Sequence, residues 1–106
     1  MSGPSRSMTP LEISMTHDLA REILKGGDLH HLWASGMAEF IINGHRGTLH
    51  VLNQIGEYKC VIHCGPNFTR YDVPLDDPAS TEFIRELIYE QQSIPRTQDE
   101  YNNWHG

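Results

Sequence analysis

The sequence predicts an α+β domain with a helix near each end of the chain and an antiparallel sheet of three to four strands between them in sequence. Two observations lead to this prediction: apolar residues recur with a helical period near both ends of the chain, and they alternate with period two in the middle. Turn-forming residues separate the alternating segments, so consecutive strands should pair as a meander. Both helices are then expected on one sheet face, which gives a two-layer sandwich.

The first helix is expected to begin at the segment Thr9-Pro10-Leu11-Glu12. This segment has the composition of a capping box, with Thr9 as the N-cap, Pro10 at the first helical position and Glu12 at the third. Apolar residues at positions 11, 15, 19 and 23 continue a helical face to Lys25, and Gly26-Gly27 ends it. Residues 11–15 also alternate as a strand would, which leaves a shorter helix over 17–25 as a second interpretation.

The middle of the chain contains the alternating segments. Strands are expected at 37–43, 48–53 and 57–64, with a weaker fourth at 68–73, whereas 28–33 is expected to be a connector. Turns are expected at 43–47, 54–56 and 65–67. Cys60 and Cys64 lie four residues apart in one strand, about 13 Å at the usual rise, so both should be reduced.

The second helix is expected over residues 78–92, with Asp77 as its N-cap and Pro78 at its first position. Apolar residues at 83, 84, 87 and 88 form one stripe on this helix. The chain therefore divides into a disordered lead (1–8), a single α+β domain (9–92) and a polar C-terminal tail (93–106).

Composition excludes several classes of function. The 106 residues carry a formal charge of −6, and residues 65–106 hold eight Asp and Glu against three Lys and Arg. This acidic balance argues against direct nucleic-acid binding, which requires a basic surface. No apolar run approaches the length of a membrane span, and residues 1–10 lack a secretory signal, so a cytoplasmic location is expected.

The first candidate binding surface combines the second helix with the tail. Glu82, Glu86 and Glu90 recur every four residues and should form one acidic ridge. Tyr101 and Trp104 in the tail are residue types that anchor protein interfaces. The pattern indicates docking of a basic protein partner, against the simpler interpretation of a solvated helix face.

The second candidate surface is the sheet face directed away from the core. If residues 53–56 join a hairpin, His50 should lie opposite Lys59, and His63 should approach Arg46. With His45 at the turn, these side chains would form a weakly basic patch that gains charge as the pH falls through about 6.5.

No catalytic or metal-binding motif is found, so no catalytic residue, metal or cofactor is assigned. His17, His30 and His31 are metal-ligand types, but adjacent histidines in an extended segment point in opposite directions. His63 and Cys64 are separated in the same way and cannot readily form a base–nucleophile pair.

The sequence thus favours a small non-enzymatic binding or regulatory protein, of the size and acidity of bacterial or phage inhibitors and host-interaction proteins. Its partner is expected to be a protein, and unpaired sheet edges also allow a homodimer. The alternative is a small-ligand or metal-dependent enzyme that uses the histidines near residues 17–31.

Overall fold

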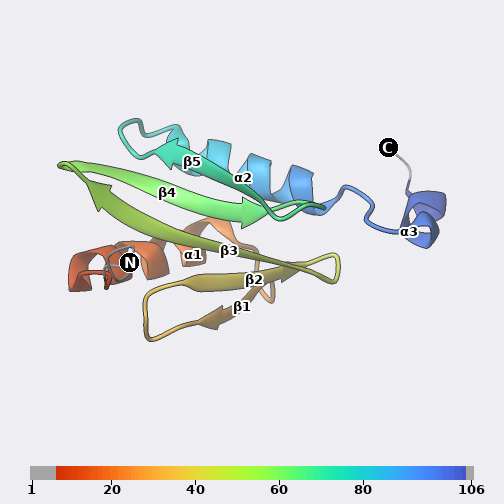
Figure 1. Ribbon diagram of the computed structural model, residues 1–106, viewed down its shortest axis with the longest axis horizontal. Coiled ribbons are helices and arrows are strands. Elements are labelled where there is room, and N and C mark those ends of the chain that lie inside the picture. Colours follow the sequence, from red (N-terminus) through yellow and green to blue (C-terminus); the bar gives the residue numbers. More distant parts are fainter. Residues whose placement is uncertain (1–6, 105–106) are drawn as a thin grey trace, which may run out of the picture.

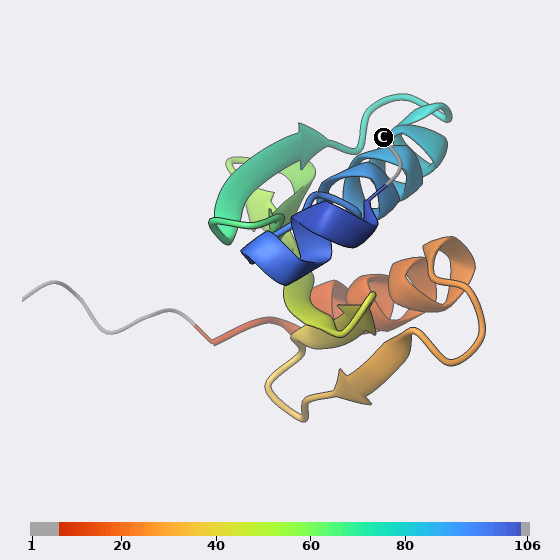
Figure 2. The same ribbon diagram turned by 90° about the vertical axis from the view of Figure 1, so that its right-hand side faces the viewer.

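The computed structural model of the chain describes residues 7–104. Helices α1 (Pro10–Ile23) and α2 (Ser80–Gln92) cover the same face of a five-stranded antiparallel sheet (Figures 1 and 2). The strands lie in sequence order: β1 (Leu29–Leu32), β2 (Ala38–Ile42), β3 (His45–Gln54), β4 (Glu57–Cys64) and β5 (Thr69–Pro74). A short helix, α3 (Gln98–Asn103), follows α2. The α+β fold class is confirmed, with at least one strand more than predicted.

Helix α1 begins with the predicted capping box. The hydroxyl of Thr9 accepts a hydrogen bond from the Glu12 amide at 3.2 Å, and the Glu12 carboxyl accepts one from the Thr9 amide at 2.7 Å. The helix is continuous from Pro10, so the alternative of a strand over residues 11–15 is wrong. Satisfying two amide groups at the N-terminus favours the helix over the extended alternative.

Two buried side chains of α1 bind the backbone of β3. The Val51 amide donates to Thr16 Oγ1 and the Asn53 amide donates to Glu12 Oε2, each at 2.7 Å. These amides lie beyond the last pair of the β2–β3 ladder, Ala38 with Leu49, because β3 has ten residues and β2 has five. Helix α1 thus supplies hydrogen bonds where β2 has ended, and buried amides are not left unsatisfied.

Strand β1 corrects the prediction of a connector at residues 28–33. Leu29, His31 and Leu32 pair with Phe40, Glu39 and Ala38, and a bulge separates Leu29 from His31. A strand of only four residues, interrupted by a bulge, lacks the regular alternation that identifies longer strands.

The two central hairpins have two-residue turns. Asn43–Gly44 and Ile55–Gly56 all have φ between 54° and 79°, as type I′ turns require. The predicted turn over 43–47 was too long, because β3 already begins at His45. The predicted register was also wrong by two residues: His50 pairs with Val61, and His63 pairs with Thr48. A shift of two keeps each side chain on its predicted face.

The core lies between the sheet and the two helices. Its fully buried members include Phe40, Leu49, Ile62, Ile84 and Ile88. Position 47 admits only glycine, because a Cβ there would lie 2.2 Å from the ring of Phe40. Cys60 and Cys64 are buried and free, as predicted.

Helix α2 begins two residues later than predicted. Its N-cap is Ala79, which has no side-chain cap, so the assignment of Asp77 as N-cap was wrong. The Asp77 carboxylate instead accepts a hydrogen bond from the Ala79 amide at 2.8 Å and forms a turn before the helix. Strand β5 includes Pro74, which the prediction placed after the strand.

The predicted terminal segments are described only in part. Residues 1–6 of the lead and residues 105–106 of the tail lie outside the described residues. Within the tail, α3 is capped by the hydroxyl of Thr97, which accepts a hydrogen bond from the Glu100 amide at 3.1 Å.

Replacing Thr16 by valine should destabilise the protein by about 1–3 kcal/mol. The substitution keeps the side-chain shape but removes the hydroxyl that serves the buried Val51 amide. Urea denaturation would measure the loss, with the exposed Ser14→Ala on the same helix as the control. Equal stability of the two variants would contradict the role assigned to Thr16.

Replacing Ile55 by asparagine should stabilise the protein by about 1 kcal/mol. Ile55 is 98% exposed and has a φ of 54°, a conformation that asparagine adopts far more readily than a β-branched residue. Thermal denaturation would detect the gain, whereas the control Ile55→Val should leave the midpoint close to that of the parent. A lower midpoint for the asparagine variant would refute this account of the turn.

Candidate functional site

The acidic ridge of α2 consists of Glu82, Glu86 and Glu90, all of which are exposed. Ile84 and Ile88 of the same helix are fully buried in the core and hold the ridge outward. Glu82 forms an ion pair with Arg85 at 2.5 Å. For Glu86 and Glu90 no ion pair is found among residues 7–104.

Most of the hydrogen bonds of Arg85 are made to the backbone of α1. Its guanidinium donates to the carbonyl oxygens of Glu22 at 2.7 Å and Ile23 at 3.1 Å, in the last turn of α1. These carbonyls lie at a helix C-terminus, where a cation is favoured. Arg85 therefore joins the two helices, and only part of its charge is directed to the ridge.

Negative charge is concentrated on the helical side of the molecule. Residues 18–28 and 76–90 carry eight carboxylates and three cations. These ranges cover the C-terminal part of α1 with the loop after it, the loop before α2, and most of α2. Their net charge of −5 compares with −6 for the whole chain. The sequence predicted an uneven distribution of charge along the chain. Because α1 and α2 lie on one side of the sheet, this charge is also distributed unevenly between the helical layer and the sheet (Figure 2).

The tail is attached through the buried side chain of Gln92. Its amide oxygen accepts hydrogen bonds from the Gly65 amide at 2.8 Å and from Arg96 at 3.0 Å, and its amide nitrogen donates to the His45 carbonyl at 2.7 Å. Arg96 also donates to the Gly65 carbonyl at 2.6 Å. The segment after α2 is thus fixed to both the β2–β3 hairpin and the β4–β5 loop.

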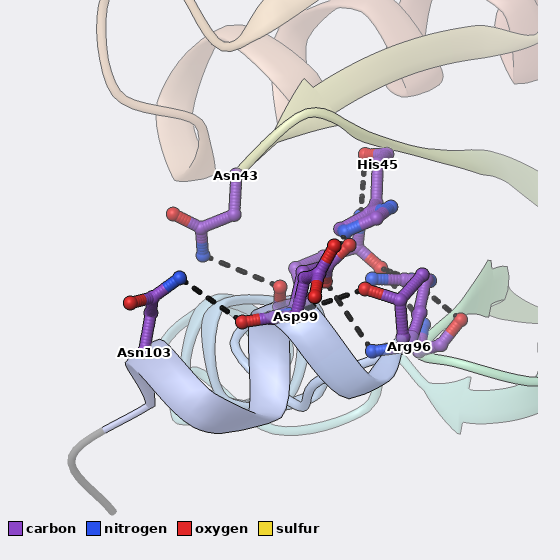
Figure 3. Close-up of polar contacts among 9 residues, drawn as sticks. Asn43, His45, Arg96, Asp99 and Asn103 are labelled. Atoms are coloured by element: carbon purple, nitrogen blue, oxygen red, sulfur yellow. Dashed lines mark hydrogen bonds and ion pairs between the residues drawn. The ribbon is translucent and has the colours of Figure 1, made fainter.

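A second contact holds α3 itself (Figure 3). His45 Nε2 lies 2.7 Å from Glu100 Oε1, which also accepts a hydrogen bond from the Arg96 amide at 3.3 Å. The hydrogen bond from His45 is the main cause that lowers the pKa of Glu100. Sequence patterns gave no reason to select Gln92, Arg96 or Glu100, because their partners are distant in the chain.

The two predicted tail aromatics lie on or next to α3. Tyr101 and Trp104 are 58% and 45% exposed, and their ring centroids are 6.2 Å apart. Trp104 lines a shallow hollow of about 580 Å³ together with His45 and Ser93. Figure 1 shows α3 set apart from α2 along the length of the molecule, so the glutamate ridge and the aromatics form two patches instead of one.

The outer sheet face carries four of the five residues of the second predicted group. The prediction was wrong for His45, which lies on the opposite face of β3 and contacts Glu100. Arg46, His50, Lys59 and His63 share this face, but its cations are largely neutralised. Arg46 pairs with Glu39, and Asp72 accepts from both Lys59 and Arg70 at 2.8 Å. These two cations lower the pKa of Asp72 to about 2, so it stays ionised. The face is therefore less basic than the sequence alone suggests.

Two further features make this face less available to anions. The ring of Phe68, a residue that the sequence analysis missed, stacks on His63 with a centroid separation of 5.3 Å and lies under Arg46. Partial burial, with the charges of His63 and Arg70, lowers the pKa of His50. His50 consequently gains its charge at a lower pH than predicted.

The residues of the enzyme alternative do not form a ligand cluster. His17 is half-buried on α1, whereas His30 and His31 are exposed on β1, where His31 packs against the edge of Trp33. Within the described part of the chain, no three His, Cys, Asp or Glu side chains are placed to hold a metal ion. Burial raises the pKa of Cys60 to about 12 and that of Cys64 to about 11, which disfavours the nucleophilic thiolate.

Acidification should release α3 from the hairpin. Because the pKa of Glu100 is lowered in the folded state, its contribution to docking is complete above the ordinary value of about 4.5 and is lost as the pH falls through the folded value. Fluorescence of Trp104 in a Trp33→Phe background would follow the release. Glu100→Gln should weaken docking at neutral pH and flatten the titration, and Asp99→Asn should change neither. A Glu100→Gln titration like that of the parent would contradict this contact.

Comparison with known proteins assigns no family or function to the chain. None of the helices in residues 7–104 is long and apolar enough to span a membrane. No protein-family model, no curated protein and no solved structure matches the chain.

Proposed function

We propose that this chain is a non-enzymatic binding protein of the cytoplasm that docks a basic surface of a protein partner onto the acidic ridge of α2. One observation carries the proposal: Glu86 and Glu90 are exposed and have no cation partner among residues 7–104, within a region of net charge −5. By contrast, Arg46, Lys59 and Arg70 of the sheet face all have carboxylate partners.

The unpaired glutamates have a physical cost that a partner would relieve. Like charges four residues apart on a helix destabilise it by a few tenths of a kcal/mol per pair, so local stability does not favour this pattern. A basic partner would remove the repulsion, and the field of the helical side would speed its approach. Because binding alone is enough to inhibit or regulate a partner, such a surface supports an inhibitory or regulatory role without catalytic groups.

A protein partner is favoured over nucleic acid. A phosphate backbone requires a surface with net positive charge, whereas the helical side is negative and the sheet face is internally paired. The enzyme alternative stays a prediction, because no cluster of described residues favours a particular reaction.

The proposal can be tested by neutralising only the two unpaired glutamates. Glu86→Gln/Glu90→Gln leaves the Glu82–Arg85 pair and its link to α1 intact. Partners would be captured from lysate of the source organism, identified, purified and measured for affinity. The double variant should bind about three- to tenfold more weakly at low salt, and the difference should shrink at high salt.

The matched control is Glu57→Gln/Asp99→Asn, which changes the net charge equally at exposed positions outside α2. Circular dichroism should show that both variants keep the fold. Equal affinity of both double variants for the captured partner would overturn the proposal.

A further inference from the structure

A groove lies between α1 and the segment that connects β5 to α2. It has a volume of about 270 Å³, and its apolar surface comes from Met15, Leu19, Val51 and Leu75. Val51 and Leu19 belong to the hydrophobic core, and Met15 and Leu75 are half-buried against it. The groove therefore exposes apolar side chains at the edge of the hydrophobic core.

Carboxylates border the groove on both sides. Asp18 and Glu22 lie one helical turn apart on α1, and Asp77 lies across from them on the connecting segment. Arg21 is 4.0 Å from Asp18, and both side chains are mostly exposed, so this pair neutralises little. The groove thus combines an apolar floor with an acidic rim.

The size of the groove limits its occupant. Sites for drug-sized ligands and cofactors usually have volumes of about 300–1,000 Å³. At about 270 Å³ the groove is smaller than these sites, with room for one or two side chains, as in recognition of a peptide segment.

We propose that this groove binds a protein segment in which one aliphatic side chain is flanked by lysine or arginine. The aliphatic group would cover the floor at Met15 and Leu75, and the flanking cations would pair with Asp18, Glu22 and Asp77. The inference rests on the proposed function, because it identifies the part of a basic partner that enters the molecule. The floor requires an apolar anchor in addition to charge, so a uniformly basic surface would not be enough.

Binding can be mapped by NMR titration of the isotope-labelled protein with a synthetic probe peptide, Gly-Ser-Gly-Lys-Lys-Leu-Lys-Lys-Gly-Ser-Gly. Amide shifts should change at Met15, Glu22, Leu75 and Ser80. A peptide with serine in place of leucine should lose most of this effect, and one with glutamate in place of lysine should lose all of it.

A rim variant and a charge-matched control test the inference. Asp18→Asn/Glu22→Gln should raise the Kd for the peptide by about three- to tenfold, whereas Glu57→Gln/Asp99→Asn, at exposed positions away from the groove, should change it less than twofold. An unchanged Kd for the rim variant, absence of shifts in the groove, or equal binding of the serine peptide would overturn the groove inference. The ridge proposal depends instead on the affinity of the captured partner for the Glu86→Gln/Glu90→Gln variant.

A second copy of the chain is the competing occupant. If the groove binds another copy, the same amides should shift with protein concentration in the absence of peptide, and sedimentation should detect a dimer. That outcome would overturn the assignment to a basic segment.

Discussion

The hydrogen bonds from α1 to β3 are the constraint that the rest of this structure depends on. Strand β3 continues past the end of β2, and the amides of Val51, which is buried, and of Asn53, which is half-buried, have no β2 carbonyl to accept them there. Thr16 and Glu12 supply the acceptors from the side of a helix. This requirement fixes the position of α1 on the sheet, and the groove beside Met15 and the acidic rim follow from that position.

Regular local patterns were predictable from the sequence. The capping box at Thr9 and Glu12 was recognised because both of its hydrogen bonds are made between neighbours in the chain. The β4 boundaries were predicted exactly as Glu57–Cys64, since four apolar residues alternate without interruption. Errors arose where a boundary depends on another element: β1 exists through its pairing with β2, and α2 starts only after the turn at Asp77.

The candidate surfaces were predictable as residue types but not as surfaces. The ridge positions follow from helical spacing, so their exposure could be anticipated. The neutralisation of the cations on the sheet face could not be predicted. Asp72 contacts Lys59 because of the β4–β5 register, and Arg46 contacts Glu39 because β2 pairs with β3. The groove also needed the structure, since Asp18 and Asp77 are distant in sequence. Recurrence of Asp18 and Glu22 on one face of α1 was the signal available beforehand.

The sequential order of the strands determines where in the fold the entropic cost of loop closure falls. The β2–β3 and β3–β4 ladders begin at two-residue turns, so their loops cost little chain entropy. The helices are joined at much longer range: the bonds from α1 to β3 span 35 and 41 residues, and those from Arg85 to α1 span 62 and 63. The entropy of loop closure is therefore concentrated in the docking of the helical layer, the same layer that carries the negative charge and the groove.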